Sequence, residues 1–423
     1  MIDYSQLTTN RSILCIDMKS FYASCSAVKM GLDPMTCYLA VVGDITRQGS
    51  VVLAASPALK QKYNIKTGAR LFEIPNDPRI HIVNPSMNLY IKISTELTKL
   101  FNRYVPFSDI LTYSIDESFL DVTGVKRLWG SPETIAFKIQ QEIKSLFGLP
   151  STVGIGPNML LAKLCLDLEA KKARGGIASW TYEDVKTKLW NISPLSEMWG
   201  IGSRVEKKLN EMGIHSVGEL ANYPLHLLEK KFGVMGNQLY YHAWGIDLSK
   251  IDSHLPQQQV SFGKSQILLR DYKKEDEIKV VILEMCEEVA KRARDAKKAA
   301  RTISFGLGFS KYSLGKDFQR SKTMEQPTNI TMDIYKVCLD LLKANYNRGD
   351  IVRQVSISIS NLVDDNEWQL DLFHQDSWKK REIGYVVDEI RNKYGPAALL
   401  RAVSYTSAGT TLHRSKLVGG HKS

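Results

Sequence analysis

Short apolar runs alternate with segments of helical spacing over the first 175 residues or so. The run Ile13 to Ile16 predicts a strand that ends at Asp17, and the following SFYASCSAV predicts a helix. The stretch ILTYSIDESFLDV predicts a strand hairpin, and STVGIG predicts a strand between two further helices, expected at 134–147 and 160–170. Interleaved strands and helices of this kind indicate an α+β domain.

The segment 176–245 changes to mostly helical spacing with short loops. At its centre WGIGSRVEKKL places Gly200 and Gly202 around Ile201, which predicts a tight turn between two helices. Glycines let backbone amides approach a phosphate, and the helix that follows adds the favourable end of its dipole. The motif resembles the helix-hairpin-helix of sequence-neutral DNA binders, so Gly200, Gly202 and Arg204 are candidate DNA contacts.

A polar stretch, IDSHLPQQQV, predicts a linker before a further domain. There a helix is expected at 278–299, and the strands ISFGLGF and VSISIS alternate strictly between apolar and small or polar residues. One strand face can be covered by helices, and the other can lie along a nucleic-acid backbone. The last sixty residues look like an appended tail.

Composition and charge narrow the class of protein. The chain has 423 residues with 43% hydrophobic and 24% charged residues, which indicates a globular protein of several domains. It contains no apolar run of eighteen residues, so we expect no membrane partner and a cytoplasmic location. Its six cysteines form no C-x-x-C pair and are expected as small core residues.

The formal net charge of +11 is concentrated between residues 289 and 322, where ten basic and two acidic side chains lie. Clustered basic charge points to a polyanionic partner, although a solvated helix face is the ordinary explanation of such a run. This stretch supplies four more candidate DNA contacts, Lys291, Arg292, Lys297 and Lys298.

Three carboxylates are the candidate chemistry: Asp17 at the end of the first strand, and Asp116 with Glu117 in the hairpin. Acidic groups in an apolar context are costly unless a cation compensates them, and oxygen ligands favour Mg²⁺. Two such ions stabilise the attacking and leaving oxygens of a phosphoryl transfer. The alternative for the hairpin pair alone is a solvated turn.

The motifs IDMKSFYASC, YSIDESFLD, TVGIGPNMLLAK and WGIG occur in the order typical of Y-family DNA polymerases. The chain most resembles the UmuC-like branch, of the bacterial error-prone DNA polymerase V type. The resemblance implies a multidomain α+β fold shaped as a right hand, with a helix-hairpin-helix thumb and an α/β little finger. The expected divisions are palm at 1–20 and 81–175, fingers at 21–80, thumb at 176–250, little finger at 258–362 and tail at 363–423.

The resemblance also implies roles for single residues. Asp17, Asp116, Glu117 and the backbone carbonyl of Met18 would hold two Mg²⁺ ions. Tyr22 would be the steric gate against a 2′-hydroxyl, with Phe21 beside it, and Lys163 would contact the triphosphate. Family members often carry a tyrosine and an arginine in the fingers where this chain has Ala58 and Gln61. Lys60 or Lys62 would supply the missing charge, and Lys60 is the expected substitute.

The tail contains QLDLF, which is the pentapeptide form of ligands of the bacterial sliding clamp. Gln369 would make polar contacts, Leu370, Leu372 and Phe373 would fill an apolar pocket, and Asp371 lies between them; a plain strand is the alternative. The resemblance leaves open whether a RecA filament or an accessory subunit activates the protein.

The implied function is low-fidelity translesion synthesis on primer-template DNA from deoxynucleoside triphosphates, in DNA repair and SOS-type mutagenesis. Small residues in the fingers, Ala54, Ala55, Ser56 and Ala58, would leave room for a damaged template base. One alternative is a catalytically silent DNA- and clamp-binding scaffold at stalled forks. The other is a palm-type nucleotidyl cyclase, which needs neither the DNA-binding hairpin nor the clamp peptide.

Overall fold

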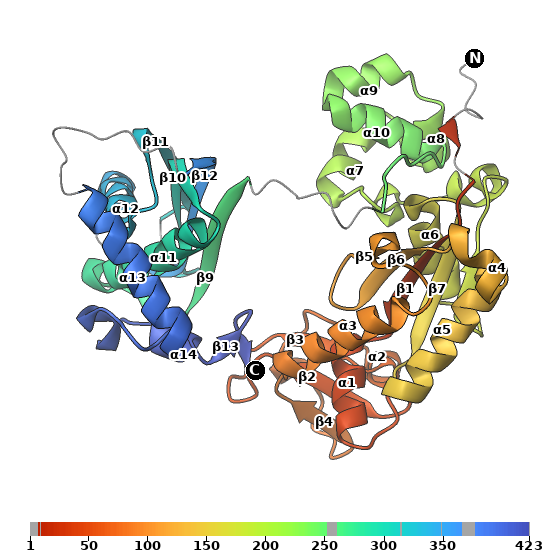
Figure 1. The fold of residues 1–423 in the computed structure, drawn as a ribbon, viewed down its shortest axis with the longest axis horizontal. Coiled ribbons are helices and arrows are strands. Elements are labelled where there is room, and N and C mark those ends of the chain that lie inside the picture. Colours follow the sequence, from red (N-terminus) through yellow and green to blue (C-terminus); the bar gives the residue numbers. More distant parts are fainter. Residues whose placement is uncertain are drawn as a thin grey trace. The chain divides into compact units, whose positions relative to one another are not determined.

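The computed structural model describes residues 7–8, 10–251, 260–313, 315–347, 349–365 and 377–422. The chain divides into two compact units, residues 1–256 with 421–423, and residues 257–420 (Figure 1). In the described part of the chain, no helix combines the length and the apolar character that crossing a membrane requires.

A five-stranded sheet organises the first unit, in the order β5-β6-β1-β7-β8, with only β7 and β8 parallel. Ile13 and Cys15 of β1 pack against Met159, Ala162 and Leu166 of the helical stretch that follows β7. The predicted strands and hairpin are confirmed, although β6 begins at Glu117 and Asp116 lies in the turn before it. The strands are β1 (Ile13–Met18), β5 (Ile110–Thr112), β6 (Glu117–Asp121), β7 (Ser151–Gly156) and β8 (Ile177–Ser179); the helices are α3 (Met87–Phe101), α4 (Lys126–Trp129), α5 (Pro132–Phe147), α6 (Met159–Cys165) and the π-helical turn η5 (Leu166–Ala170).

A smaller sheet of order β3-β2-β4 lies in the same unit. The boundary expected between residues 80 and 81 falls inside β4, which pairs in parallel with β2. Ala54, Ala55 and Ser56 are buried in the core of this segment, so these three side chains cannot line a template pocket; Ala58 alone of the four is half-exposed. The elements are α1 (Phe21–Lys29), β2 (Tyr38–Val42), β3 (Val52–Ala55), α2 (Pro57–Tyr63) and β4 (Ile80–Val83).

The helical segment of the first unit shares its core with α6, because Leu160, Leu161 and Leu164 pack with Leu209 and Leu228. Gly200 has φ +95°, a conformation that favours glycine, and Gly202 caps α7. The element before Gly200 is a single 3₁₀ turn rather than the full helix that the sequence predicted. The helices are α7 (Ser203–Asn210), α8 (Val217–Ala221), α9 (Leu225–Phe232) and α10 (Val234–Ala243).

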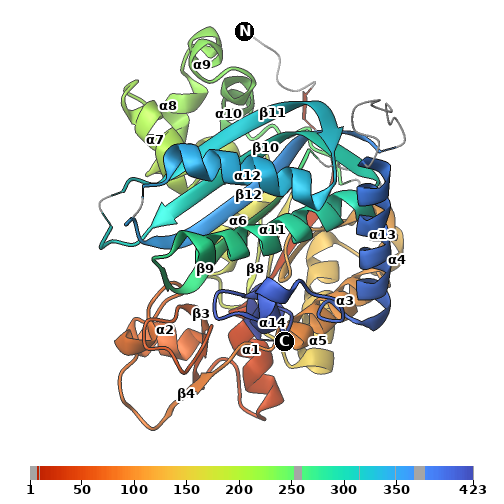
Figure 2. The ribbon, with the colours of Figure 1, turned by 90° about the vertical axis from the view of Figure 1, so that its left-hand side faces the viewer.

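The second unit is an antiparallel sheet of order β11-β10-β12-β9, with α11 and α12 across one face (Figure 2). The predicted alternation is confirmed, since Ile303, Phe305 and Ile357 are buried under the helices. The helix expected to reach residue 299 ends at Asp295, because Lys297 takes φ 53° and the chain turns into β10. The elements are β9 (Ser261–Tyr272), α11 (Glu275–Asp295), β10 (Lys298–Phe309), β11 (Phe318–Thr328), α12 (Thr331–Asn345) and β12 (Val352–Asp364).

Residues 377–420, expected as part of an appended tail, pack on the second unit, whereas His421 and Lys422 belong to the first unit. Arg294 of α11 donates to Asp388 at 2.6 Å, and both side chains are buried. Glu284 accepts hydrogen bonds from Thr410 at 2.8 Å. The clamp-like peptide, residues 369–373, lies outside the described residues. The elements are α13 (Ser377–Tyr394), η8 (Ala402–Tyr405), α14 (Thr411–Arg414), β13 (Leu417–Val418) and β14 (His421–Lys422).

Candidate active site

Asp17 and Glu117 lie directly opposite each other on the antiparallel strands β1 and β6. Residues paired in this way point to the same face of a sheet, so the two carboxylates share one side. Asp116 is held beside them, because its carbonyl accepts from the Met18 amide at 3.0 Å and its side chain accepts from Ser114 Oγ at 2.7 Å. The structure thus brings together the three predicted carboxylates and Met18.

The electrostatics of this corner favour a cation. Burial raises the pKa of Asp17 to about 6, Lys171 opposes that rise, and the charges of Asp116 and Glu117 add to it. A hard divalent ion would relieve the repulsion among these carboxylates, and oxygen donors are its preferred ligands. The chemistry of the donor set therefore fits Mg²⁺, and the groups that would hold it are the carboxylates of Asp17, Asp116 and Glu117 and the Met18 carbonyl.

Within the described residues, no three acidic, histidine or cysteine side chains converge closely enough to hold an ion as they stand. Both oxygens of Glu117 have other partners. The Cys15 thiol donates to Oε1 at 3.3 Å, and Lys163 Nζ donates to Oε2 at 2.8 Å. The carboxylate that we expect to bind metal is therefore paired with a protein cation here.

Lys163 is placed differently from a lysine that projects toward substrate. Its side chain is 10% exposed and contacts Glu117 and Asp167. Burial alone would lower the pKa of its ammonium, but the hydrogen bond to Glu117 and the two carboxylate charges outweigh burial, and the pKa is raised. In this structure the Lys163 ammonium is thus paired within the carboxylate cluster.

Lys171 and Asp167 were not singled out from the sequence. Lys171 Nζ lies 3.7 Å from Asp17 Oδ2 and 2.8 Å from Asp167 Oδ1, and its side chain is 37% exposed. The available signal was the spacing of Lys163, Asp167 and Lys171, four residues apart on a helical stretch, which puts them on one face.

The expected nucleotide contacts surround the same corner. Tyr22 stacks on Tyr90 with ring centroids 4.3 Å apart, while Phe21 is buried in the core. Lys60 Nζ donates to Ser20 Oγ at 2.9 Å. Burial lowers the pKa of Lys60, the charge of Asp17 opposes that shift and Lys171 adds to it, so Lys60 belongs to the same charged neighbourhood.

The backbone around the glycine turn is open. Gly200, Gly202 and Arg204 are exposed, and a Cβ placed on either glycine would meet nothing within 4 Å. A second turn of this kind, missed from the sequence, joins α9 to α10 at Gly233, which has φ +61°; Val234 beside it is 88% exposed. Two exposed glycine turns at helix starts suit phosphate backbone contacts.

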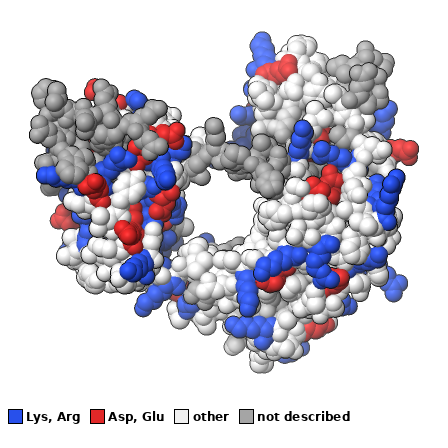
Figure 3. Space-filling model, in the orientation of Figure 1, with Lys and Arg blue, Asp and Glu red and all other residues white. Residues whose placement is uncertain are grey.

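The basic residues expected to bind DNA from the second unit are mostly engaged within it. Lys291 pairs with Asp295, Arg292 with Glu288 and Lys298 with Asp364, while Lys297 is exposed in the turn after α11. On the face drawn in Figure 3, lysines and arginines of both units are interspersed with acidic side chains.

The sheet face opposite α11 and α12 is lined by small hydroxyl residues. Thr302 bonds to Thr323 at 3.1 Å, Ser304 to Ser321 at 2.8 Å, and Asn361 donates to Thr302 at 2.8 Å. This polar face is what the strand alternation predicted.

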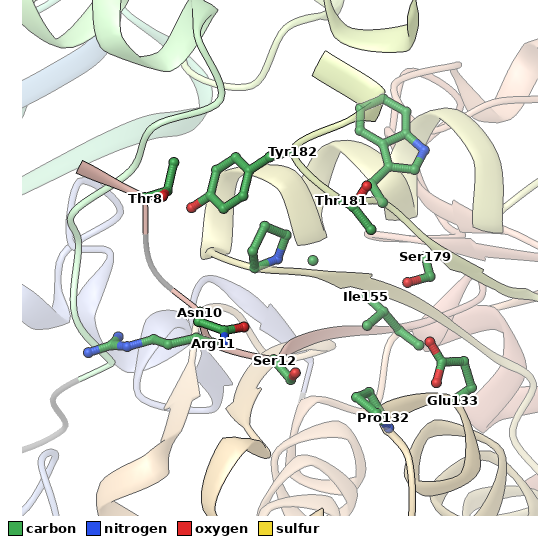
Figure 4. Close-up of a pocket in the computed structure, with 13 residues that line it drawn as sticks. Thr8, Asn10, Arg11, Ser12, Pro132, Glu133, Ile155, Ser179, Thr181 and Tyr182 are labelled. Atoms are coloured by element: carbon green, nitrogen blue, oxygen red, sulfur yellow. The ribbon is translucent and has the colours of Figure 1, made fainter. Parts of the chain in front are cut away.

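A pocket of about 420 Å³ lies elsewhere on the first unit (Figure 4). Ser12 lines it, so it lies at the opposite end of β1 from Asp17. It is formed by the ends of β7 and β8, the start of α5 and the segment before β1, and Arg11 and Tyr182 line it. None of the predicted site residues contributes to it.

A carboxylate corner on a mixed sheet, a small second sheet, a helical segment with glycine turns and a separate sheet domain are the parts expected of a right-hand nucleic-acid polymerase. The impB/mucB/samB family model matches residues 16–167, its C-terminal domain model matches 259–372, and the thumb domain of DNA polymerase iota matches 196–247. The chain belongs to the impB/mucB/samB family of Y-family DNA-directed DNA polymerases.

Relatives of known name cover the whole chain. UvrX of Bacillus subtilis (strain 168), named for UV-damage repair, is 63% identical over 423 residues and covers 100% of both chains. DNA polymerase IV 2 of the same organism is 40% identical over 97% of this chain and 98% of its own. Among solved structures, a Y-family Dbh-Dpo4 polymerase chimera matches with TM-score 0.66 at 21% identity, over 84% of this chain and 99% of its own, which shows the shared fold.

Proposed function

We propose that this polymerase extends a primer by two-metal nucleotidyl transfer and is specialised for low-fidelity synthesis across damaged template. The observation that carries the proposal is the pairing of Asp17 with Glu117 across β1 and β6, with Asp116 beside them. Three carboxylates at one sheet end suit the binding of two Mg²⁺ ions, which supply charge stabilisation for the attacking and leaving oxygens.

In this proposal the protein aligns the incoming nucleotide and neutralises the charge of its phosphates. Asp17, Asp116, Glu117 and the Met18 carbonyl hold the ions, and Tyr22 lies under the sugar of the incoming deoxynucleotide. Lys163, expected on the triphosphate, is held by Glu117, so a phosphate contact requires it to leave that carboxylate. Lys171 and Lys60 lie on the same corner, with Lys171 the more exposed, and we assign them to the phosphates together with Lys163.

Primer extension with purified protein, Mg²⁺ and deoxynucleotides tests the proposal. An Asp116→Ala, Glu117→Ala double variant removes two of the three carboxylates, and we expect a rate loss of at least about 1,000-fold, because each lost electrostatic contact to a transition state costs 10²–10³. A Tyr22→Ala variant should admit ribonucleotides. A double variant as active as the wild type would overturn the metal assignment.

The rival function is a silent scaffold at stalled forks. It predicts DNA and clamp binding without extension on any template, whereas the polymerase predicts extension on intact DNA. Retention of all three carboxylates favours the polymerase over the scaffold. The exposed glycine turn at Gly200 disfavours a nucleotidyl cyclase, which has no need of a duplex contact.

Lesion bypass is supported by the relative named for UV-damage repair, and the buried Ala54, Ala55 and Ser56 do not contribute to that support. Passage of an abasic site, measured on templates identical except for the lesion, tests it. Arrest one nucleotide before the lesion, under conditions that copy the intact template, would contradict it.

Partners complete the proposal. We assign the peptide Gln369 to Phe373 to a bacterial sliding clamp, and primer-template DNA to the glycine turns and the hydroxyl face of the second unit. We further propose a role in SOS-type mutagenesis in the cytoplasm, with dependence on RecA or an accessory subunit. Comparing extension with and without RecA filaments tests the dependence on RecA.

A further inference from the structure

Asp167 contacts the two lysines that pair with Glu117 and Asp17, and it belongs to none of the sequence motifs described above. It is in η5, the π-helical turn that continues α6, four positions after Lys163 and four positions before Lys171. Single π-helical turns inside helices occur frequently at functional sites. The packing of Ala162 and Leu166 against Cys15 holds this stretch on the face that carries Asp17 and Glu117.

The ion pairs form one continuous chain of alternating charge. Glu117 Oε2 lies 2.8 Å from Lys163 Nζ, which lies 3.2 Å from Asp167 Oδ2. Asp167 Oδ1 lies 2.8 Å from Lys171 Nζ, which lies 3.7 Å from Asp17 Oδ2. Asp167 is therefore the anion shared by both lysines, and each lysine's other carboxylate is an expected metal ligand.

We propose that Asp167 is a positioning residue for the metal site. Asp167 holds the Lys171 ammonium at 2.8 Å and so keeps it 3.7 Å from Asp17. Lys163 stays bonded to Glu117 at 2.8 Å, but Asp167 at 3.2 Å shares its charge and weakens its competition with a divalent cation for Glu117. The proposal rests on the metal role assigned above to Asp17, Asp116 and Glu117.

The ion pairs in this series differ in how deeply they are buried, and burial sets how strongly each pair interacts. Lys163 and Glu117 are about one-tenth exposed, whereas Asp167 and Lys171 are about one-third exposed. Solvent screens the outer pair, and the inner pair interacts through a lower effective dielectric. Loss of Asp167 would therefore act chiefly by leaving Glu117 as the sole carboxylate against the Lys163 ammonium.

The net charge of the cluster also predicts that loss of Asp167 weakens the binding of a divalent cation. The four carboxylates Asp17, Asp116, Glu117 and Asp167 outnumber the three ammonium groups of Lys60, Lys163 and Lys171, and Asp167→Asn removes one negative charge from this set. A less negative cluster binds a divalent cation more weakly. Asp167 itself makes no assigned contact with the ion, so the rate at saturating Mg²⁺ should largely recover.

The test is Mn²⁺ binding to the full chain with primer-template and a non-hydrolysable nucleotide, followed by electron paramagnetic resonance, together with the Mg²⁺ half-saturation of single nucleotide addition. We expect Asp167→Asn to weaken Mn²⁺ binding and raise the Mg²⁺ half-saturation by about tenfold, the low end for partners of metal ligands. Asp167→Glu, which keeps the charge, should restore most of the loss, and added salt should shrink the difference.

Two further variants separate the possible failures. Glu96→Gln removes a carboxylate from the surface pair with Lys99 and should leave both readouts unchanged. If Asp116→Ala weakens Mn²⁺ binding and Asp167→Asn does not, the positioning role is overturned and the metal site stands. If neither variant weakens Mn²⁺ binding, the metal assignment itself fails. Asp167→Ala, with thermal melting as a check of folding, must reproduce the Asp167→Asn shift.

Discussion

At the residue scale, the side chains at the carboxylate corner are positioned by contacts with their neighbours. Tyr22 is held by its stack on Tyr90, whose hydroxyl hydrogen-bonds to Ser26 Oγ at 2.8 Å within the core. Glu117 is held by Cys15 on one oxygen and by Lys163 on the other. We assign no chemistry to Tyr90 or Cys15, but each contacts a side chain to which we do assign a role, Tyr22 or Glu117.

Tyr90→Leu removes the ring under Tyr22, so we expect the gate to loosen and ribonucleotide incorporation to rise by about fivefold, the equivalent of an aromatic stack of about 1 kcal/mol. Tyr90→Phe keeps the stack and loses only the bond to Ser26, so its effect should be smaller. The ratio of ribonucleotide to deoxynucleotide incorporation measures both. An unchanged ratio in Tyr90→Leu, with a clear change in Tyr22→Ala, would show that the stack does not support the gate.

Cys15→Ala removes the thiol that donates to Glu117 Oε1, and we expect the Mg²⁺ half-saturation of nucleotide addition to rise about tenfold or less. Cys15→Ser keeps a donor at the same place and should stay closer to the wild type. Equal shifts of the Mg²⁺ half-saturation in Cys15→Ala and Cys15→Ser would point to packing instead of the hydrogen bond.

The Cys15 thiol should also resist alkylation. Because burial raises its pKa well above its usual range, with the Glu117 charge adding to the shift, alkylating agents should leave the folded protein active.

At the element scale, α13 is attached to α11 through charge. Arg294 and Asp388 are 3% and 6% exposed, and Arg391 with Arg401 binds Glu287. The opposite side of α13 leaves Ile383 and Val386 exposed. A helix joined by buried ion pairs depends on every partner, because removing one leaves a buried charge uncompensated.

Asp388→Ala should therefore cost about 3–5 kcal/mol of unfolding free energy, or release α13 from the second unit. Urea unfolding and limited proteolysis near residue 380 measure the two outcomes. Asp340→Asn breaks the surface pair with Lys322 and should cost no more than about 1 kcal/mol. Equal costs for the two variants would contradict a structural role for the buried pair.

At the scale of the whole molecule, two units and a clamp-like peptide share one chain. The peptide, residues 369–373, lies between β12 and α13, both of which belong to the second unit. A clamp bound there would raise the effective concentration of primer ends near the palm without any new contact to the substrate.

Deleting Gln369 to Phe373 should shorten the products of each binding event when the clamp is loaded, and leave single additions without clamp unchanged. Product length on a long template, with and without clamp, is the measurement. A scrambled peptide of equal length controls for the deletion itself. Equal losses in both conditions would show that the segment serves folding and has no part in clamp recruitment.

Local patterns were sufficient for much of this protein. The apolar run ending at Asp17, the hairpin around Glu117 and the alternation of ISFGLGF and VSISIS each depend on neighbours in the chain, and the structure has these elements as predicted. Motif order alone was enough to indicate the Y family, which the comparisons confirm. Helix ends were less predictable, since α11 stops where Lys297 adopts a left-handed backbone.

Contacts between distant residues were decided by tertiary structure alone. Lys163 reads as a substrate lysine in its motif, yet its ammonium meets Glu117, 46 residues away. The C-terminal helix reads as a tail, yet Arg294 and Asp388 meet across 94 residues. A sequence pattern records which side chains are charged and which face they occupy, but the partner of a buried charge depends on which elements pack together.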